Sequence, residues 1–138
     1  PTGILDEGAA YSVEKHYVPA PDRAEWRTAI LNSQAHLHSL GITGWQDAWV
    51  IPDTLDAYGS LVDDGLLTAR VVAALWWERD QGLEQIERFV AQRQNGGRGD
   101  RLLTRTVKIM ADGVVENGTG ACSRRTTTAV AGTRTTTA

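Results

Sequence analysis

Cysteine is nearly absent from this chain of 138 residues, since Cys122 is its only one. A single cysteine excludes an internal disulfide framework and any zinc site built from several cysteines. The chain also has no apolar run approaching the roughly 20 residues of a membrane-spanning helix. It opens with Pro1 and no basic-then-apolar leader. We therefore expect a cytoplasmic protein without a membrane partner, and the missing initiator methionine suggests a piece of a longer chain.

An excess of basic residues is also lacking. The 14 Lys and Arg residues stand against 17 Asp and Glu residues, a formal net charge of −3. This balance gives no basic footprint for nucleic acid and no polybasic patch for a membrane surface. Hydrophobic residues make up 41% of the chain, enough for a core, and the length suits one ordinary domain.

The last 18 residues differ in composition from the rest. Residues 121–138 contain seven threonines and three arginines but no acid, so they carry +3 and residues 1–120 carry −6. With Val130 as its only large aliphatic residue, this segment reads as low complexity, and we expect it to be disordered. A natural linker and the wrong-frame translation of a GC-rich gene both explain it. We therefore divide the chain into 1–120 and a tail, 121–138.

Residues 1–120 alternate helical and strand patterns, which predicts an α/β fold. The helices are expected over 22–40, 52–65 and 83–95, and the strands over 42–50, 70–77 and 105–113. Asp22 and Glu25 form a capping-box pattern, and Gly41 and Gly65 follow the first two helices. The strand starts are 28 and 35 residues apart, which is typical of parallel strands joined by crossover helices.

Three such strands suit either a doubly wound sheet or part of a (β/α)8 barrel. A complete barrel needs about 250 residues, so this chain supplies fewer than half of the strands. A sheet ending at its third strand leaves a buried-type edge exposed. The chain is then a fragment, or the missing strands come from elsewhere.

Lys108 is the most informative candidate for chemistry. Strand alternation separates two sets of side chains, Val107, Ile109 and Ala111 on one face and Lys108, Met110 and Asp112 on the other. The apolar set suits a face covered by helices, which leaves Lys108 on the inner face. A lysine there must be paired, neutralised or bound, because a lone buried ammonium is costly. A Lys108–Asp112 ion pair and a partly solvated lysine are the structural alternatives.

The other candidates are weaker. His36 and His38 fall on a helix, where residues two apart point about 200° away from each other and cannot share an ion, and His16 lies in a loop-like stretch. The glycine-rich segment 111–120 lacks the following helix that a phosphate loop needs. The strand tryptophans Trp45, Trp49, Trp76 and Trp77 are expected mainly in the core. Trp76, Trp77 and Asp112 are nevertheless weak candidates for substrate contacts.

Three blocks, Pro1–Ala9, Leu40–Ala48 and Val107–Thr119, occur in this order and together resemble amidohydrolase family 3. That family includes enzymes similar to N-substituted formamide deformylase, and the resemblance covers residues 1–120 but not the tail. It implies an internal fragment of a (β/α)8 metal-dependent hydrolase that acts on small-molecule amides or formamides, cleaving a non-peptide carbon–nitrogen bond. The absence of a family-like continuation after Gly120 favours the wrong-frame explanation of the tail.

The resemblance also implies a role for Lys108, which matches the lysine of the fourth barrel strand. In similar enzymes this lysine can be carbamylated and bridge two divalent ions, here zinc. The histidines of the first, fifth and sixth strands have no counterpart among His16, His36 and His38. We therefore expect no metal and no catalysis in this chain alone. The alternative function is a non-catalytic α/β module that binds a partner through its sheet edge. The oligomeric state cannot be read from the sequence.

Overall fold

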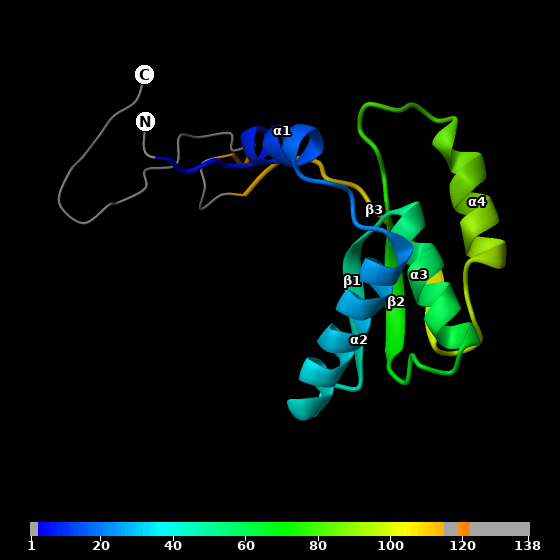
Figure 1. The fold of residues 1–138 in the computed structure, drawn as a ribbon. Coiled ribbons are helices and arrows are strands. Elements are labelled where there is room, and N and C mark those ends of the chain that lie inside the picture. The colour runs from blue at the N-terminus through cyan, green and yellow to red at the C-terminus, as the bar shows by residue number, and fades with distance from the viewer. Residues whose placement is uncertain (1–2, 115–118, 122–138) are drawn as a thin grey trace, which may run out of the picture. The chain divides into compact units, whose positions relative to one another are not determined.

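A computed structural model describes residues 3–114 and 119–121 of the chain. The chain divides into two compact units, one formed by Pro1–Ala20 with Met110–Ala138 and the other by Pro21–Ile109. Figure 1 shows the elements of both units. Apart from Ala121, the predicted low-complexity tail lies outside the described residues. Within the described residues, no helix has the length and apolar character needed to cross a membrane.

A three-stranded parallel sheet forms the centre of the larger unit. Its strands are β1 (Gly44–Val50), β2 (Arg70–Trp76) and β3 (Leu102–Lys108), in the spatial order β1-β2-β3. Both neighbouring pairs run parallel, which confirms the predicted α/β class. The third strand was expected over 105–113, and this placement is wrong. Trp77 N–H donates to the Lys108 carbonyl at 3.0 Å, and β2 ends at Trp76, so residues 109–113 have no strand to pair with.

The helices of this unit are α2 (Arg23–Ser39), α3 (Pro52–Asp63) and α4 (Gln85–Asn95). The predicted capping box is present at the start of α2, where Asp22 and Glu25 each accept the other's backbone N–H at 2.8 Å. The predicted helix ends are also correct. Gly41 and Gly65 have φ values of 78° and 71°, a left-handed conformation that glycine adopts without steric cost.

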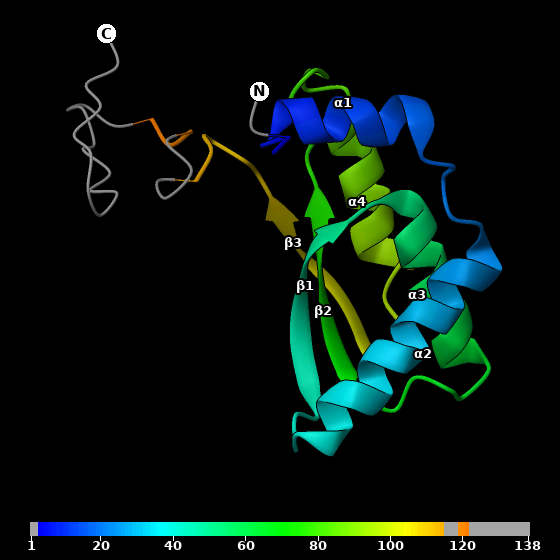
Figure 2. The same cartoon turned by 60° about the vertical axis from the view of Figure 1, so that its left-hand side comes forward.

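All three helices pack on one face of the sheet, as Figure 2 shows. The core lies between them and the β2 side chains that point the same way, Val71, Ala73 and Leu75. α2 contributes Ile30, α3 contributes most of the helical core, and α4 contributes Phe89. Three apolar residues in or just before α4 are exposed, namely Leu83, Ile86 and Val90. The reason is that α4 packs beside the last strand of the sheet, where the apolar surface ends.

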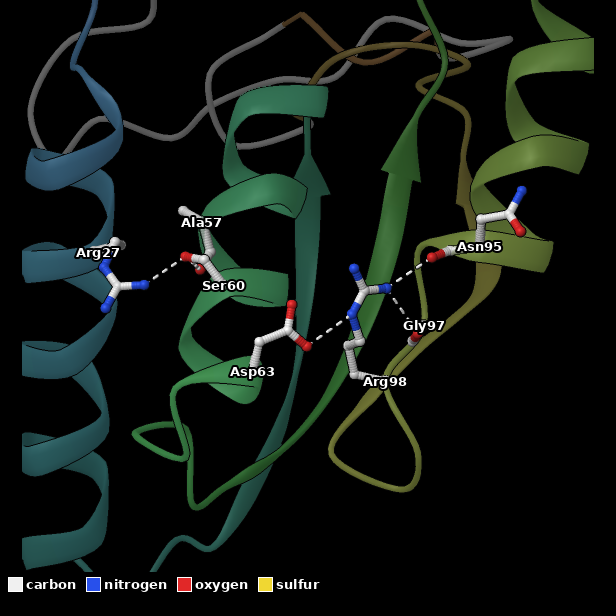
Figure 3. A network of polar contacts seen from close by, with 7 residues as sticks. All are labelled: Arg27, Ala57, Ser60, Asp63, Asn95, Gly97 and Arg98. Carbon is white, nitrogen blue, oxygen red and sulfur yellow. Dashed lines mark hydrogen bonds and ion pairs between the residues drawn. The ribbon is translucent and has the colours of Figure 1, made fainter.

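Polar contacts join the helices to one another, as Figure 3 shows. Arg27 of α2 donates to Ser60 Oγ of α3 at 2.6 Å. At the other side of α3, Asp63 accepts from Arg98 Nε at 3.0 Å, and Arg98 also donates to the carbonyls of Asn95 and Gly97. These contacts fix α3 between α2 and the turn that follows α4.

The smaller unit contains α1 (Gly8–Tyr17). His16, which the sequence placed in a loop, lies in this helix, and its Nδ1 is 2.6 Å from the Ser12 carbonyl oxygen. The helix was missed because it has no buried residues and so lacks a strong apolar period. In the same unit Thr119 Oγ1 accepts the Val114 N–H at 2.8 Å, and the Thr119 carbonyl accepts the Gly113 N–H at 3.2 Å.

A buried tyrosine links α3 to the first strand. The Tyr58 hydroxyl donates to Asp47 Oδ2 at 3.1 Å and accepts from Trp45 Nε1 at 3.4 Å. Burial raises the pKa of Tyr58 well above its ordinary value of 10.0, the Trp45 hydrogen bond opposes this, and the Asp47 carboxylate adds to it.

We therefore expect stability to fall as the pH rises above about 10, because unfolded tyrosine ionises there while folded Tyr58 keeps its proton. Urea unfolding of the wild type and of Tyr58→Phe between pH 8 and 11 measures this. The variant should lose less stability over that range. Equal slopes for the two proteins would contradict the prediction.

Candidate functional site at the carboxyl edge of the sheet

The carboxyl ends of the three strands lie at one edge, because all three run in the same direction. Sites of parallel α/β folds gather at this edge. Trp76 and Lys108 are the last residues of β2 and β3 and are neighbours in register. The larger unit has no helix over the opposite face of the sheet in the residues described.

The pairing of β2 with β3 determines the face on which Lys108 lies. Val107 is beside the core residue Leu75, and Lys108 is beside Trp76, which points to the helix-free face. The register shifts by one residue between the Val72 and Ala74 rungs. Thr104, before this shift, faces the helices and donates to the Gln92 carbonyl at 3.0 Å. Lys108 is therefore half-buried on the helix-free face.

Two tryptophans extend this face toward β1. The rings of Trp49 and Trp76 stack with their centroids 4.1 Å apart and their planes at 10°. The core interpretation is wrong for both residues. Trp49 is 43% exposed, and Trp76 is half-buried but is not packed against the core cluster. The interpretation is correct for Trp45 and Trp77, which pack against the core under the helices, and Trp77 stacks on Phe89 at 5.5 Å. Trp77 consequently lies on the other face from Lys108.

The predicted alternation of Lys108, Met110 and Asp112 on one face stops at Lys108, where β3 ends. Met110 and Asp112 follow the end of β3 in a segment without regular structure, so alternation no longer assigns them to the face of Lys108. Asp112 Oδ2 accepts the Ala121 N–H at 2.9 Å. Ile109, expected under the helices, is exposed for the same reason.

One buried residue near this edge was missed by the sequence analysis. Gln85, at the start of α4, accepts the Glu78 N–H at 3.0 Å and donates to the carbonyls of Glu78, Gln81 and Gly82 at 2.9–3.1 Å. It thereby shapes the loop between β2 and α4. The available signal was a glutamine in the first turn of a helix after a polar loop, where side chains commonly satisfy free backbone groups.

The described residues do not by themselves form a metal centre. Within residues 3–114 and 119–121, no three His, Cys, Asp or Glu side chains gather as ligands. His36 and His38 are exposed on α2, far along the chain from the strand that carries Lys108. Lys108 is thus a single candidate ligand, and we derive no catalytic step through a metal from these residues.

The strands are parallel and each is joined to the next through a helix, so this unit belongs to the class of folds built from repeated βα units. The chain is similar to the crystal structure of an uncharacterized metal-dependent hydrolase from Pyrococcus furiosus, with 23% sequence identity and a TM-score of 0.54. The match covers 78% of this chain and 21% of that one, so the chain spans about a fifth of the neighbour's length. This likeness supports the barrel section as the fold.

The sequence itself identifies the family. The model of the amidohydrolase family matches residues 1–137, and the chain belongs to that family. The match extends into the threonine-rich tail. No curated protein matches the chain.

Proposed function

We propose that this chain is part of a metal-dependent hydrolase that cleaves a non-peptide carbon–nitrogen bond of a small amide or formamide. Membership of the amidohydrolase family and the hydrolase neighbour support the general reaction class. The observation that carries the proposal is the place of Lys108, at the carboxyl end of its strand on the helix-free face. In a complete barrel that face is the interior.

A lysine enclosed there would need its charge compensated or removed. Carbamylation requires the neutral amine, which desolvation favours, and it would convert Lys108 into a carboxylate able to ligate metal. A divalent metal, which we propose to be zinc, would polarise the substrate carbonyl and acidify a bound water. The remaining ligands would come from strands other than β1, β2 and β3.

We expect the isolated chain to be inactive, because a catalytic zinc needs about three protein ligands and this chain offers one candidate. Purified protein with added Zn²⁺ should not hydrolyse simple amides or N-substituted formamides above the background rate. Hydrolysis by this chain that a chelator abolishes would contradict the prediction.

The complete protein provides the positive test. It should hydrolyse small amides or formamides in a reaction that a chelator stops and a divalent metal restores, and it should leave peptides intact. Absence of such activity in metal-loaded protein would overturn the proposal. In that case the edges of β1 and β3, each paired on one side only among the described residues, would favour the partner-binding module.

A further inference from the structure

A cleft lies at the opposite edge of the sheet, where the three strands begin. Its volume is about 400 Å³, and six exposed residues line it: His38, Thr43, Thr68, Arg70, Asp100 and Arg101. Thr43 directly precedes β1, Arg70 begins β2, and Arg101 directly precedes β3. The cleft is therefore distinct from the edge that carries Lys108 and does not depend on the proposed hydrolase function.

The two arginines of this cleft differ from others in the unit. Arg23, Arg27 and Arg98 each pair with an aspartate, at 2.7–3.0 Å. By contrast, the side chain of Arg70 has no ion pair or hydrogen bond to any residue that the structure describes. Arg101 donates to the Thr68 carbonyl, which holds its guanidinium across the cleft and leaves further N–H groups for a ligand.

The arginines of the cleft do not serve to bind the free carbonyls at the ends of helices. α2 and α3 end at this edge, and their last carbonyls would otherwise attract cations. Backbone caps already use them, because Gly41 N–H donates to the His38 carbonyl at 2.9 Å and Leu66 N–H to the Leu61 carbonyl at 2.8 Å. The Arg70 guanidinium is thus available to a ligand.

The side chains of Asp100 and His38 also line the cleft, and they influence how strongly it would hold an anion. Asp100 is its one acidic lining residue, and it lies beyond the 4.0 Å ion-pair distance from both arginines. Its carboxylate repels an anion held nearby. The His38 ring can also donate a hydrogen bond to an anion.

We propose that this cleft binds a small phosphorylated molecule through its phosphate group. Guanidinium groups recognise phosphate oxygens through paired hydrogen bonds, and the Thr43 and Thr68 hydroxyls are further donors. A volume of about 400 Å³ lies near the lower end of the roughly 300–1,000 Å³ of small-molecule pockets. It has room for a phosphate and a short carbon skeleton.

The proposal is tested by titrating the full chain with inorganic phosphate and with glycerol phosphate at constant ionic strength, following backbone amide signals by NMR. The expected result is saturable shifts at Thr43, Arg70 and Arg101, with glycerol phosphate binding more tightly. Arg70→Gln and Arg101→Gln should each weaken binding roughly tenfold or more, since each removes a charged hydrogen bond.

Two variants make the test specific. Asp100→Asn should tighten binding, because it removes the repelling carboxylate. Arg79→Gln is the matched control, since Arg79 is an exposed arginine in the loop between β2 and α4, outside the cleft, and should bind as the wild type does. Unchanged circular dichroism without ligand establishes that each variant is folded. Equal affinity of folded Arg70→Gln and wild type, or the same shifts with chloride, would overturn the proposal.

Discussion

Replacing Lys108 with alanine is expected to remove nearly all amide hydrolysis from the complete protein. The helix-free position of Lys108 beside Trp76 makes it the candidate ligand of the proposed metal site. Partners that merely orient metal ligands cost roughly 10–100-fold when replaced. Loss of a bridging ligand should therefore lower kcat/KM by at least about 100-fold. Steady-state kinetics on a small formamide, with metal content measured in parallel, tests this expectation.

Three comparisons separate the carbamate from a simple charge effect. Lys108→Arg should be as inactive as the alanine variant, because a guanidinium cannot become a bridging carboxylate. Added acetate or propionate should restore part of the activity of Lys108→Ala by supplying that carboxylate. Lys15→Ala removes the other lysine of these 138 residues, which is exposed on α1, and should remain active. Full activity in Lys108→Ala would show that the lysine does not hold the metal.

The second large effect concerns the stability of the sheet–helix core. Leu61 of α3 is 0% exposed and belongs to the core cluster between helices and sheet. Leu61→Ala removes buried apolar surface and leaves a cavity, which in well-packed cores costs about 2–5 kcal/mol. Because small domains have roughly 5–15 kcal/mol of stability, such a loss should shift the urea midpoint strongly.

Leu83→Ala is the matched control for this measurement. Leu83 has the same side chain but is 74% exposed, so its removal should change the free energy of unfolding by less than about 0.5 kcal/mol. Urea unfolding followed by tryptophan fluorescence compares the two variants. Similar losses in both would mean that α3 does not pack on the sheet as described.

The helices were predictable where local chemistry defines their ends. The Asp22–Glu25 capping box and the glycines Gly41 and Gly65 each act within a few residues of the boundary they mark. The end of β3 was not predictable in this way. The apolar pattern continues through Ile109 and Ala111, but the strand stops where its neighbour β2 stops, and this limit is set by pairing between distant segments.

The two candidate sites also differ in whether local sequence is enough to predict them. The face of Lys108 follows from alternation over two residues at the end of β3, so the sequence contains that information. The cleft around Arg70 brings together His38 of α2, Thr68 of the loop between α3 and β2, and Arg101 of the loop between α4 and β3. No local sequence pattern predicts that residues so far apart in the chain line one cleft. The stack of Trp49 on Trp76 was missed for the same reason, since it depends on how two strands are aligned.

The register shift in β3 has a counterpart in β1. Between β1 and β2, the difference in residue number of paired residues falls from 26 at Asp47–Ala73 to 25 at Val50–Leu75. Between β2 and β3, it rises from 31 at Val72–Leu103 to 32 at Ala74–Thr106. Both outer strands thus contain one residue more than the central strand over this stretch. Without the extra residue of β3, alternation would place Lys108 on the face of Thr104, four residues before it, and so under the helices. The extra residue in β3 therefore turns Lys108 to the helix-free face. Deleting Arg105 would restore one-to-one pairing and keep Lys108 beside Trp76, so the deletion would shorten the strand without moving the lysine to the other face.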